Sequence, residues 1–246
     1  MQATVYGIPG SHPVKSGVLM LEHKGIAHRV VQVPPVLCRP ALRAMGFPAG
    51  TVPAVKLDGR RIQTTLALSR TLDELRPHPP LFPDDPDRRR AVEDAERWGD
   101  EVLQPVPRRL AYATLRRDRS AMASFFEGAM LGAPPNLAVA AAGPIVAMGS
   151  RINAAGDDAA RADLTALPGL LDRVDALIEQ GTIGADEPNA ADFQIAPSIR
   201  LMMLFDDLRP AIEGRPAAEH AMTTVPHYAG HVGPALPQEW LPARHS

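Results

Sequence analysis

Hydrophobic residues in the first third of the chain alternate between the spacing of β-strands and that of α-helices. Strand-like runs cover residues 2–7, 28–33, 52–57 and 60–63. A helical spacing of about 3.6 residues links Val14, Val18 and Leu21, a short helix is predicted over 40–45, and Leu68, Leu72 and Leu75 define a third stripe. The order strand–helix–strand–helix–strand–strand–helix predicts a mixed sheet with helices on its faces.

Capping and turn residues mark the ends of these elements. Ser11 can cap the first helix, and Gly25 is a typical helix stop. Asp58-Gly59 between two strand-like runs predicts a tight hairpin. Thr64 or Thr65 can cap the third helix.

Prolines separate this region from the rest of the chain. Residues 76–86 contain five of them, and because proline lacks an amide donor we expect a semi-rigid linker over 77–87. Beyond the linker, apolar residues recur at helical spacing and no convincing strand pattern is present. The sequence therefore predicts an α/β domain over residues 1–76 and an all-helical domain over residues 88–246.

Composition narrows the class of protein. The 246 residues are 45% hydrophobic and 22% charged with a net charge of −2, which does not favour a nucleic-acid-binding protein. The arginine groups, such as Arg108-Arg109 and Arg116-Arg117, are interleaved with acidic residues and predict solvated helix faces. A single cysteine, no signal-peptide pattern and a longest apolar run of only 137–148 favour a cytoplasmic protein that is not embedded in a membrane.

Val52-Pro53 is the first candidate for chemistry. A proline at the start of a strand cannot donate a ladder hydrogen bond, which places it at an edge, a bulge or a cis peptide bond. We predict a cis bond here, because the pair directly precedes a strand, a hairpin and a capped helix. The backbone of Val52 could then pair with an extended peptide ligand.

Two helix N-termini could either bind an anion or simply be capped. At Thr64-Thr65, unpaired amides and the helix dipole suit a carboxylate, and a hydroxyl adds a donor. At Ser11, the hydroxyl could donate to a thiolate whose pKa the helix N-terminus lowers. Simple N-capping is the alternative at both sites: local sequence favours it at Thr64-Thr65, and at Ser11 the two roles are compatible. Gly10-Ser11-His12-Pro13 lacks the Gly-x-Ser-x-Gly elbow, so a hydrolase is not indicated.

Other polar residues are interpreted as structural. Asn189-Ala190-Ala191-Asp192 has the form of a capping box at the start of a buried helix. Cys38 has no catalytic partner nearby in the sequence, and we predict an unreactive thiol. His227 and His231 lack both a regular helix and a third ligand, so no metal site is predicted.

Taken together, four segments resemble the glutathione transferase superfamily. They are residues 6–26 as its first strand and helix, 47–55 as its Asn-Pro-x-Gly-Lys-Val-Pro-x-Leu segment, 62–68 as Leu-x-Glu-Ser-x-Ala-Ile, and 188–192 as its Ser/Thr-x-Ala-Asp motif. Their order and spacing hold over about residues 1–206. The resemblance implies a thioredoxin-like N-terminal domain, an all-helical C-terminal domain and a homodimer.

The resemblance also implies a set of site residues. The backbone of Val52, beside Pro53, would pair with the cysteinyl part of glutathione. Thr65 would hold the γ-glutamyl carboxylate with Thr64 next to it, and Ser11 would be the catalytic serine that stabilises the thiolate. This sequence departs from the family pattern at three positions, which are Phe47 for its Asn, Thr51 for its Lys or Gln, and Thr64 for its Glu.

The resemblance further implies an enzyme that conjugates glutathione, or a related thiol, to a hydrophobic electrophile without a metal. The electrophile pocket would come from the helical domain, where Met122, Phe125, Phe126 and Met130 are candidates for the pocket or for core packing. An alternative is a binding or scaffold protein that kept the fold and lost the thiol chemistry. A disulfide reductase using Cys38 is disfavoured, because no Cys-x-x-Cys is present.

Overall fold

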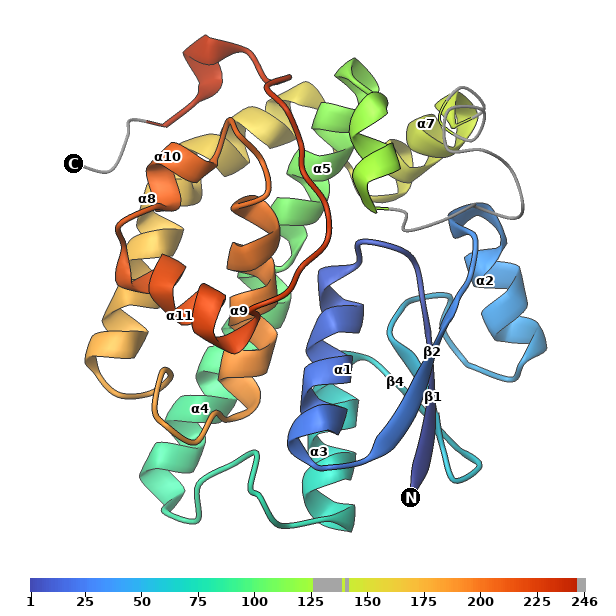
Figure 1. Cartoon of the computed structure of the whole chain (residues 1–246), viewed down its shortest axis with the longest axis vertical. Helices are drawn as coiled ribbons and strands as arrows, with labels where there is room; N and C mark the ends of the chain where they lie inside the picture. The colour runs from blue at the N-terminus through green and yellow to red at the C-terminus, as the bar shows by residue number, and fades with distance from the viewer. Residues whose placement is uncertain (126–138, 140–141, 243–246) are drawn as a thin grey trace. The chain divides into compact units, whose positions relative to one another are not determined.

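The structure, a computed structural model, describes residues 1–125, 139 and 142–242 (Figure 1). The chain divides into two compact units. The first comprises Met1–Glu101 with Gln180–Pro197, and the second comprises Val102–Glu179 with Ser198–Ser246. The predicted domains, residues 1–76 and 88–246 on either side of a linker over 77–87, stay a prediction.

The first unit is built on a four-stranded mixed sheet. Its elements are β1 (Gln2–Gly7), α1 (His12–His23), β2 (Ala27–Gln32), α2 (Pro35–Ala44), β3 (Ala54–Leu57), β4 (Arg60–Gln63), α3 (Thr65–Leu75) and α4 (Pro86–Trp98), followed by a π-helical turn, η1 (Gly99–Leu103). The strand order is β2-β1-β3-β4, with β1 parallel to β2 and antiparallel to β3. Helices α1 and α3 pack together on one side of the sheet and α2 lies on the other (Figure 1). The predicted order of seven elements and the mixed sheet are confirmed.

Local chemistry explains where these elements end. Gly25 has φ +59, and the amides of Gly25 and Ile26 return to the carbonyls of Glu22 and Leu21, which closes α1 as predicted. In the β3–β4 hairpin, Asp58 (φ +45) and Gly59 (φ +91) both take the left-handed conformation that a type I′ turn requires.

Two predicted boundaries are wrong. Helix α2 begins at Pro35 rather than at residue 40, and Pro40 lies inside it. One interior proline removes a single helical hydrogen bond, and buried Cys38 and Leu42 on the same helix compensate by packing into the core. Strand β3 begins at Ala54 rather than at residue 52, because Val52 and Pro53 lie before the ladder.

Packing against α1 fixes the position of Pro53. A Cβ atom built on Gly17 would lie 3.2 Å from Leu68 Cδ2 and 3.6 Å from Pro53 Cβ, so the glycine lets α1 approach both residues closely. On the α2 side, a second core cluster is formed by Val33, Cys38, Leu42, Phe47 and Ala54. Val52 packs against the rim of this cluster.

A single buried lysine holds the proline-rich segment between α3 and α4. The side chain of Lys24 is 0% exposed, and its Nζ donates to Asp73 Oδ1 at 2.9 Å. The same Nζ donates to the carbonyls of Arg76 at 2.7 Å and of Pro79 at 2.6 Å. Asp73 Oδ1 also accepts from the amide of Leu81 at 2.8 Å, and His23 Nε2 lies 3.2 Å from the carbonyl of Pro80, so side chains at the end of α1 and on α3 hold this segment at several points.

The regular elements in the described part of the second unit are helices, beside an isolated parallel bridge between Phe205 and Val232. Its elements are α5 (Pro105–Arg117), η2 (Ser120–Phe125), α7 (Gly143–Ile152), α8 (Asp157–Glu179), the last part of α9 (Ala190–Met202), α10 (Arg209–Ile212), α11 (Pro216–Thr224) and η3 (Gln238–Trp240). Phe125 ends η2, whereas Phe126, Met130 and the side chain of Met122 lie outside the described residues. None of the helices in the described part of the chain combines the length and apolarity needed to cross a lipid bilayer.

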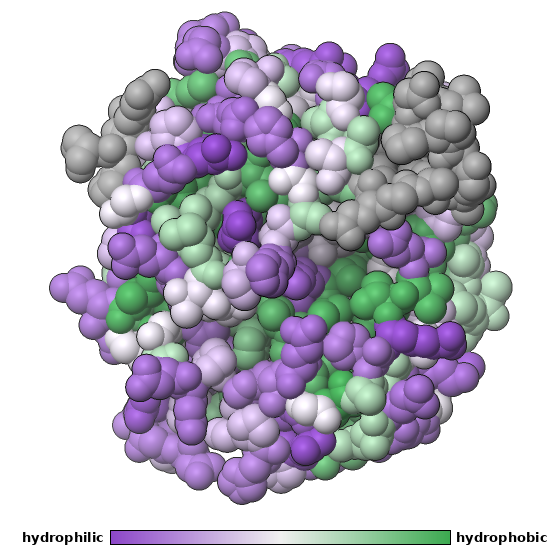
Figure 2. Space-filling model, viewed as in Figure 1, coloured by the Kyte–Doolittle hydropathy of each residue, from purple (hydrophilic) through white to green (hydrophobic). Residues whose placement is uncertain are grey.

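The surface of the first unit carries some exposed hydrophobic side chains. Figure 2 shows hydrophobic residues breaking the polar surface where the sheet and α2 face the viewer. Val30 on edge strand β2 is 46% exposed, and Leu37 on α2 is 55% exposed. Scattered apolar residues of this kind are normal on a soluble surface, so they assign no function by themselves.

Candidate functional site

The sheet topology brings all the predicted site residues to one edge of the first unit. Ser11 follows the carboxyl end of β1, Val52-Pro53 precedes the amino end of β3, and Thr64-Thr65 follows the carboxyl end of β4. Because β1–β3 and β3–β4 are antiparallel pairs, with Tyr6 opposite Ala54 and Ala54 opposite Gln63, these three ends meet. Residues separated by up to 54 positions therefore share one edge.

Ser11 occupies the N-cap position of α1, but its side chain makes no capping hydrogen bond. It is partly exposed, and its amide bonds to the carbonyl of Ile8 at 3.3 Å. The first turn of α1 contains no acidic residue to offset the positive end of the helix dipole. The hydroxyl is thus placed at a helix N-terminus without a capping role.

The predicted cis peptide bond between Val52 and Pro53 is confirmed. Pro53 is buried and Val52 is partly buried. In the described part of the chain, no hydrogen bond engages the backbone N–H or C=O of Val52. Both groups can therefore serve an extended peptide.

Thr64, the N-cap residue of α3, has an unusual backbone conformation. Its φ is +78° and its ψ is 152°, a region adopted almost only by glycine. Its hydroxyl oxygen accepts from the amide of Ala67 at 3.2 Å, so it caps the helix as one of the two predicted roles requires. The hydroxyl hydrogen remains able to donate elsewhere.

Thr65 is hydrogen-bonded to Asp100, which also bonds to Gln194, and the sequence analysis indicated neither of these two residues. Thr65 is 1% exposed, and its hydroxyl donates to Asp100 Oδ1 at 3.3 Å. The side-chain amide of Gln194 donates to the same oxygen at 3.3 Å. Asp100 and Gln194 lie 35 and 94 residues from these partners in the chain, and no local pattern connects them. A carboxylate therefore stands beside the N-terminus of α3.

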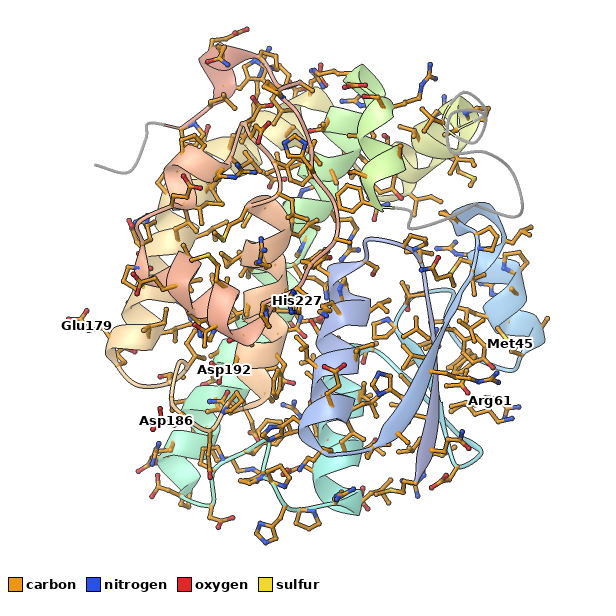
Figure 3. The ribbon with its side chains drawn as sticks, in the orientation of Figure 1. Met45, Arg61, Glu179, Asp186, Asp192 and His227 are labelled. Atoms are coloured by element: carbon orange, nitrogen blue, oxygen red, sulfur yellow. The ribbon has the colours of Figure 1, made fainter. Side chains whose placement is uncertain are left out.

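Two side chains of β4 fasten the segment between α2 and Val52. Arg61 Nε donates to the carbonyl of Met45 at 2.7 Å, and Figure 3 shows these two side chains next to each other. Gln63 makes three hydrogen bonds to the backbone of Ala49 and Thr51. The sequence analysis missed Gln63, because nothing in the β4 pattern distinguishes it from an ordinary strand residue.

The family departures have structural consequences. Phe47 is 3% exposed and packs in the core, with its ring centroid 5.8 Å from that of Tyr6. It therefore provides no polar group where the family has an asparagine. Thr51 is exposed, and its carbonyl accepts from Gln63.

The predicted capping box at α9 is confirmed. Asn189 Oδ1 accepts from the amide of Ala191 at 2.9 Å, and Asp192 Oδ2 accepts from the amide of Asn189 at 2.7 Å. Asp192 Oδ1 also accepts from the amide of Gly184 at 2.7 Å. Burial of the carboxyl raises the pKa of Asp192 to about 6, although these backbone hydrogen bonds act in the opposite direction.

In the described residues, the remaining nucleophilic and titratable groups considered from the sequence do not come together as a second centre. Burial raises the pKa of the Cys38 thiol, which lowers its reactivity. His231 Nε2 lies 2.9 Å from Asp206 Oδ2, but the Ser124 hydroxyl contacts the backbone of His231 and not its ring, so these residues make no catalytic triad. In the described residues, no group of three or more His, Cys, Asp or Glu side chains could hold a metal ion.

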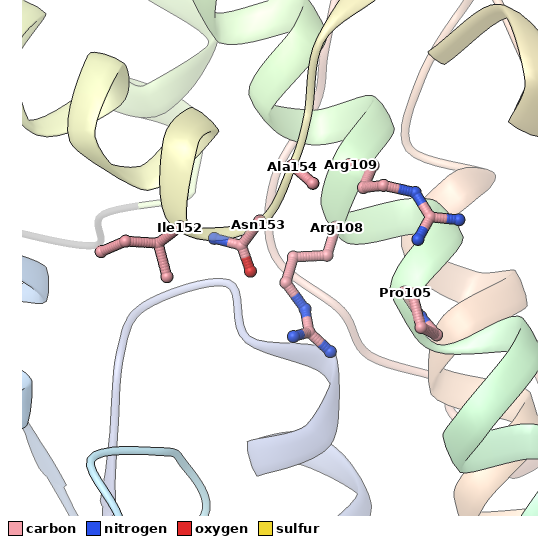
Figure 4. Close-up of a pocket in the computed structure, with 6 residues that line it drawn as sticks. All are labelled: Pro105, Arg108, Arg109, Ile152, Asn153 and Ala154. Atoms are coloured by element: carbon pink, nitrogen blue, oxygen red, sulfur yellow. The ribbon is translucent and has the colours of Figure 1, made fainter. Parts of the chain in front are cut away.

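The second unit has a shallow hollow at the start of α5. Its volume is about 250 Å³, and it is lined by Pro105, Arg108, Arg109, Ile152, Asn153 and Ala154 (Figure 4). Arg109 is not a solvated surface residue as predicted, because it pairs with buried Asp163, its Nε lying 2.6 Å from Asp163 Oδ2. The lining of the hollow is mixed, with Pro105, Ile152 and Ala154 beside two arginines and an asparagine.

Comparisons with known proteins agree with this arrangement. The family model for the N-terminal domain of glutathione S-transferases matches residues 5–80. A comparison with curated protein sequences finds no match to the chain.

Solved structures with similar folds include enzymes of this class. A glutathione S-transferase from Rhodospirillum rubrum is 18% identical with a TM-score of 0.58, covering 90% of this chain and 86% of its own. A theta class glutathione S-transferase from Xanthomonas axonopodis pv. citri with glutathione bound is 19% identical with a TM-score of 0.58, covering 90% and 89%. A β-etherase from Sphingobium is 16% identical with a TM-score of 0.60, covering 91% and 99%.

Residues 5–80 thus match the N-terminal domain of glutathione S-transferases, and the chain has the fold of the glutathione transferase superfamily. The resemblance that the sequence motifs indicated is confirmed, and so is the predicted fold class, a thioredoxin-like α/β part followed by a helical part.

Proposed function

We propose that this protein is an enzyme that conjugates glutathione to a hydrophobic electrophile. The observation that carries the proposal is the meeting of three features at one sheet edge. They are a hydroxyl at a helix N-terminus (Ser11), a backbone with available N–H and C=O groups beside a cis-proline (Val52), and a second helix N-terminus (Thr64-Thr65). A γ-glutamyl tripeptide with a thiol presents matching chemistry.

Each feature has a role in the proposal. The backbone amides at the start of α3, that of Thr65 among them, hold the γ-glutamyl carboxylate, because the first turn of α3 contains no acidic residue. The Thr65 hydroxyl donates its one hydrogen to Asp100 and orients the Asp100 carboxylate. Asp100, beside Thr65, accepts from the γ-glutamyl ammonium group. The Val52 backbone, next to Pro53, pairs with the cysteinyl residue.

Ser11 is the proposed catalytic residue. Its hydroxyl donates a hydrogen bond to the glutathione sulfur, and this bond is stronger to the thiolate than to the thiol. Together with the dipole of α1 it lowers the pKa of the bound thiol, so more thiolate is present at neutral pH. The thiolate then attacks the electrophile, and the leaving group departs with the electron pair of the broken bond.

The strained backbone at Thr64 supports a functional site here. A non-glycine residue at φ +78° costs about 1–3 kcal/mol and persists where the surrounding structure enforces it. Such residues cluster at ligand sites. The strain orients the first amides of α3 at the edge where Ser11 and Val52 also lie.

For the second substrate we propose a site on the second unit. The hollow next to Pro105 and Ile152 combines these apolar side chains with Arg108 and Asn153, so it offers both apolar contact and polar groups to an electrophile. We also propose a cytoplasmic homodimer. Light scattering at micromolar concentration would contradict the dimer if it gave a monomer mass.

Calorimetric titration with glutathione tests the binding step. The dipeptide cysteinylglycine is the control ligand, because it keeps the thiol and lacks the γ-glutamyl carboxylate. We expect glutathione to bind with micromolar to millimolar affinity and the dipeptide to bind at least about tenfold more weakly, a difference of about 1.4 kcal/mol. Absence of binding at millimolar glutathione would overturn the proposed function.

One observation favours a second candidate, a binding protein that has the glutathione transferase fold but no thiol chemistry. At the three positions that depart from the family pattern, Phe47 is a core aromatic residue, Thr51 has an exposed side chain and Thr64 caps a helix. None of the three supplies the amide or charged side chain that the family has there. A turnover assay with 1-chloro-2,4-dinitrobenzene separates the two candidates. Glutathione binding without conjugation of this or other electrophiles would favour the binding protein.

A further inference from the structure

We propose that Gln63 is a positioning residue that holds the loop before Val52 in the shape required for glutathione binding. This inference rests on the proposed function, because its readout is the affinity of the site for glutathione. Gln63 is the last residue of β4 and directly precedes Thr64. It therefore links the two proposed binding segments at the sheet edge.

The side-chain amide of Gln63 makes three hydrogen bonds to the loop. Its Oε1 accepts from the amide of Ala49 at 2.9 Å, and its Nε2 donates to the carbonyl of Ala49 at 2.7 Å. The same Nε2 donates to the carbonyl of Thr51 at 2.8 Å. Ala49 thus receives from a side chain the two-way pairing that a neighbouring strand would give it.

The chemistry of the contact requires a primary amide. The loop presents one N–H and two C=O groups to this point, and an amide offers one acceptor and two donors. A carboxylate of the same size would face both carbonyls without a hydrogen to donate. A thioether would leave all three backbone groups without their partner.

The loop depends on this contact because the sheet does not reach it. The β3–β4 ladder ends at the pair Ala54–Gln63, so residues 49–53 have no strand neighbour in register beyond that pair. Arg61 Nε donates to the carbonyl of Met45, just after α2 and several residues before this loop. Gln63 is a polar tie between β4 and the residues immediately before Val52.

The loop backbone also follows a tight path. A Cβ atom built on Gly50 would lie 2.2 Å from Arg39 Cγ, so this glycine lies directly against the α2 side chain. A loop released by loss of Gln63 would have to be ordered again when glutathione binds. Ordering of this kind reduces affinity and leaves the chemical step untouched.

Two variants and a control test the proposal. Gln63→Met keeps the length of the side chain and removes all three hydrogen bonds, and Gln63→Glu keeps the acceptor and removes the donors. Arg60→Met, an exposed change on the same strand, is the matched control. Thermal melting identifies any variant that does not fold, and the Met variant suffices if the Glu variant fails.

The first readout is amide hydrogen exchange in the protein without ligand. We expect Ala49, whose amide donates to Gln63, to exchange at least about tenfold faster in Gln63→Met than in the wild type and the control. The second readout is steady-state kinetics. We expect the KM and Kd for glutathione to rise at least about tenfold, with kcat within about twofold of the wild type.

Unchanged exchange at Ala49 would show that the Gln63 side chain does not hold the loop. Faster exchange with unchanged Kd and KM, or a fall in kcat alone, would overturn its role in binding. If the wild type binds no glutathione, the proposed function fails and the positioning role fails with it. The exchange data would still report whether Gln63 holds the loop.

Discussion

Replacing Lys24 by methionine should destabilise the protein strongly. The change keeps an unbranched apolar stem and removes the ammonium group that joins α1 to the segment after α3. Lys24 Nζ holds Asp73 and the carbonyls of Arg76 and Pro79, and its side chain has no exposure to water. The variant leaves these acceptors without their donor in a place that solvent does not reach freely.

The size of the effect follows from this geometry. Removing one member of a buried ion pair costs about 3–5 kcal/mol, because the remaining charge is left without compensation. The side chain of Asp73 is 16% exposed and keeps its bond to the Leu81 amide, which favours the lower part of that range. For a chain of this length, about 3 kcal/mol corresponds to a fall in Tm of roughly 6–12 °C.

Thermal and urea unfolding measure the loss directly. Lys56→Met is the matched control, since Lys56 is exposed on β3, and we expect a change within about 0.5 kcal/mol. Asp73→Asn should recover part of the loss in the Lys24→Met background, because it removes the stranded charge. A Tm for Lys24→Met within about 2 °C of the wild type would refute the reasoning.

Three further predictions concern the site and the second unit. Ser11→Ala should raise the pKa of bound glutathione by roughly one to two units and reduce turnover at neutral pH about tenfold, because one charge-assisted hydrogen bond is worth about 1.5–3 kcal/mol. Ultraviolet titration of the bound thiol measures this pKa, and identical curves for the wild type and the variant would remove Ser11 from the mechanism. The Tm should change little, since the hydroxyl makes no capping hydrogen bond. Thr64→Gly should stabilise the protein by about 1 kcal/mol, because it relieves φ +78°, and should weaken glutathione binding. The control Ala154→Gly relieves φ +50° in the second unit and should stabilise the protein without changing the affinity for glutathione. Equal affinities of the wild type and Thr64→Gly in calorimetry would contradict a role for the strain. Burial lowers the pKa of His220 from 6.5 to about 4, so the unfolded chain takes up this proton first, and stability present above pH 6.5 is lost as the pH falls towards 4, by up to roughly 3 kcal/mol. His220→Gln should flatten this part of the profile of unfolding free energy against pH and exposed His227→Gln should not; parallel profiles for the wild type and His220→Gln would show that the buried imidazole does not set the slope.

Local signals in the sequence were sufficient for most of the first unit. The alternation of apolar residues, Gly25 at the end of α1 and Asp58-Gly59 in the hairpin predicted the elements and their order, because each depends on backbone preferences within a few residues. The same locality predicted the cis bond at Val52-Pro53 and the capping box at Asn189. The start of α2 was missed, since Pro40 disfavours helix locally and tertiary packing of Cys38 and Leu42 outweighs it.

The sequence by itself also determined which residues could carry chemistry, because hydroxyl groups, helix starts and prolines can be recognised where they stand. Only the tertiary structure decided how they combine. It placed Asp100 and Gln194 beside Thr65, left the Ser11 hydroxyl outside the helix cap, and turned Gln63 into a tie on the loop before Val52. The physical reason is range: hydrogen bonds between residues 12 to 94 positions apart depend on sheet register and helix packing, and no pattern within a single segment specifies them.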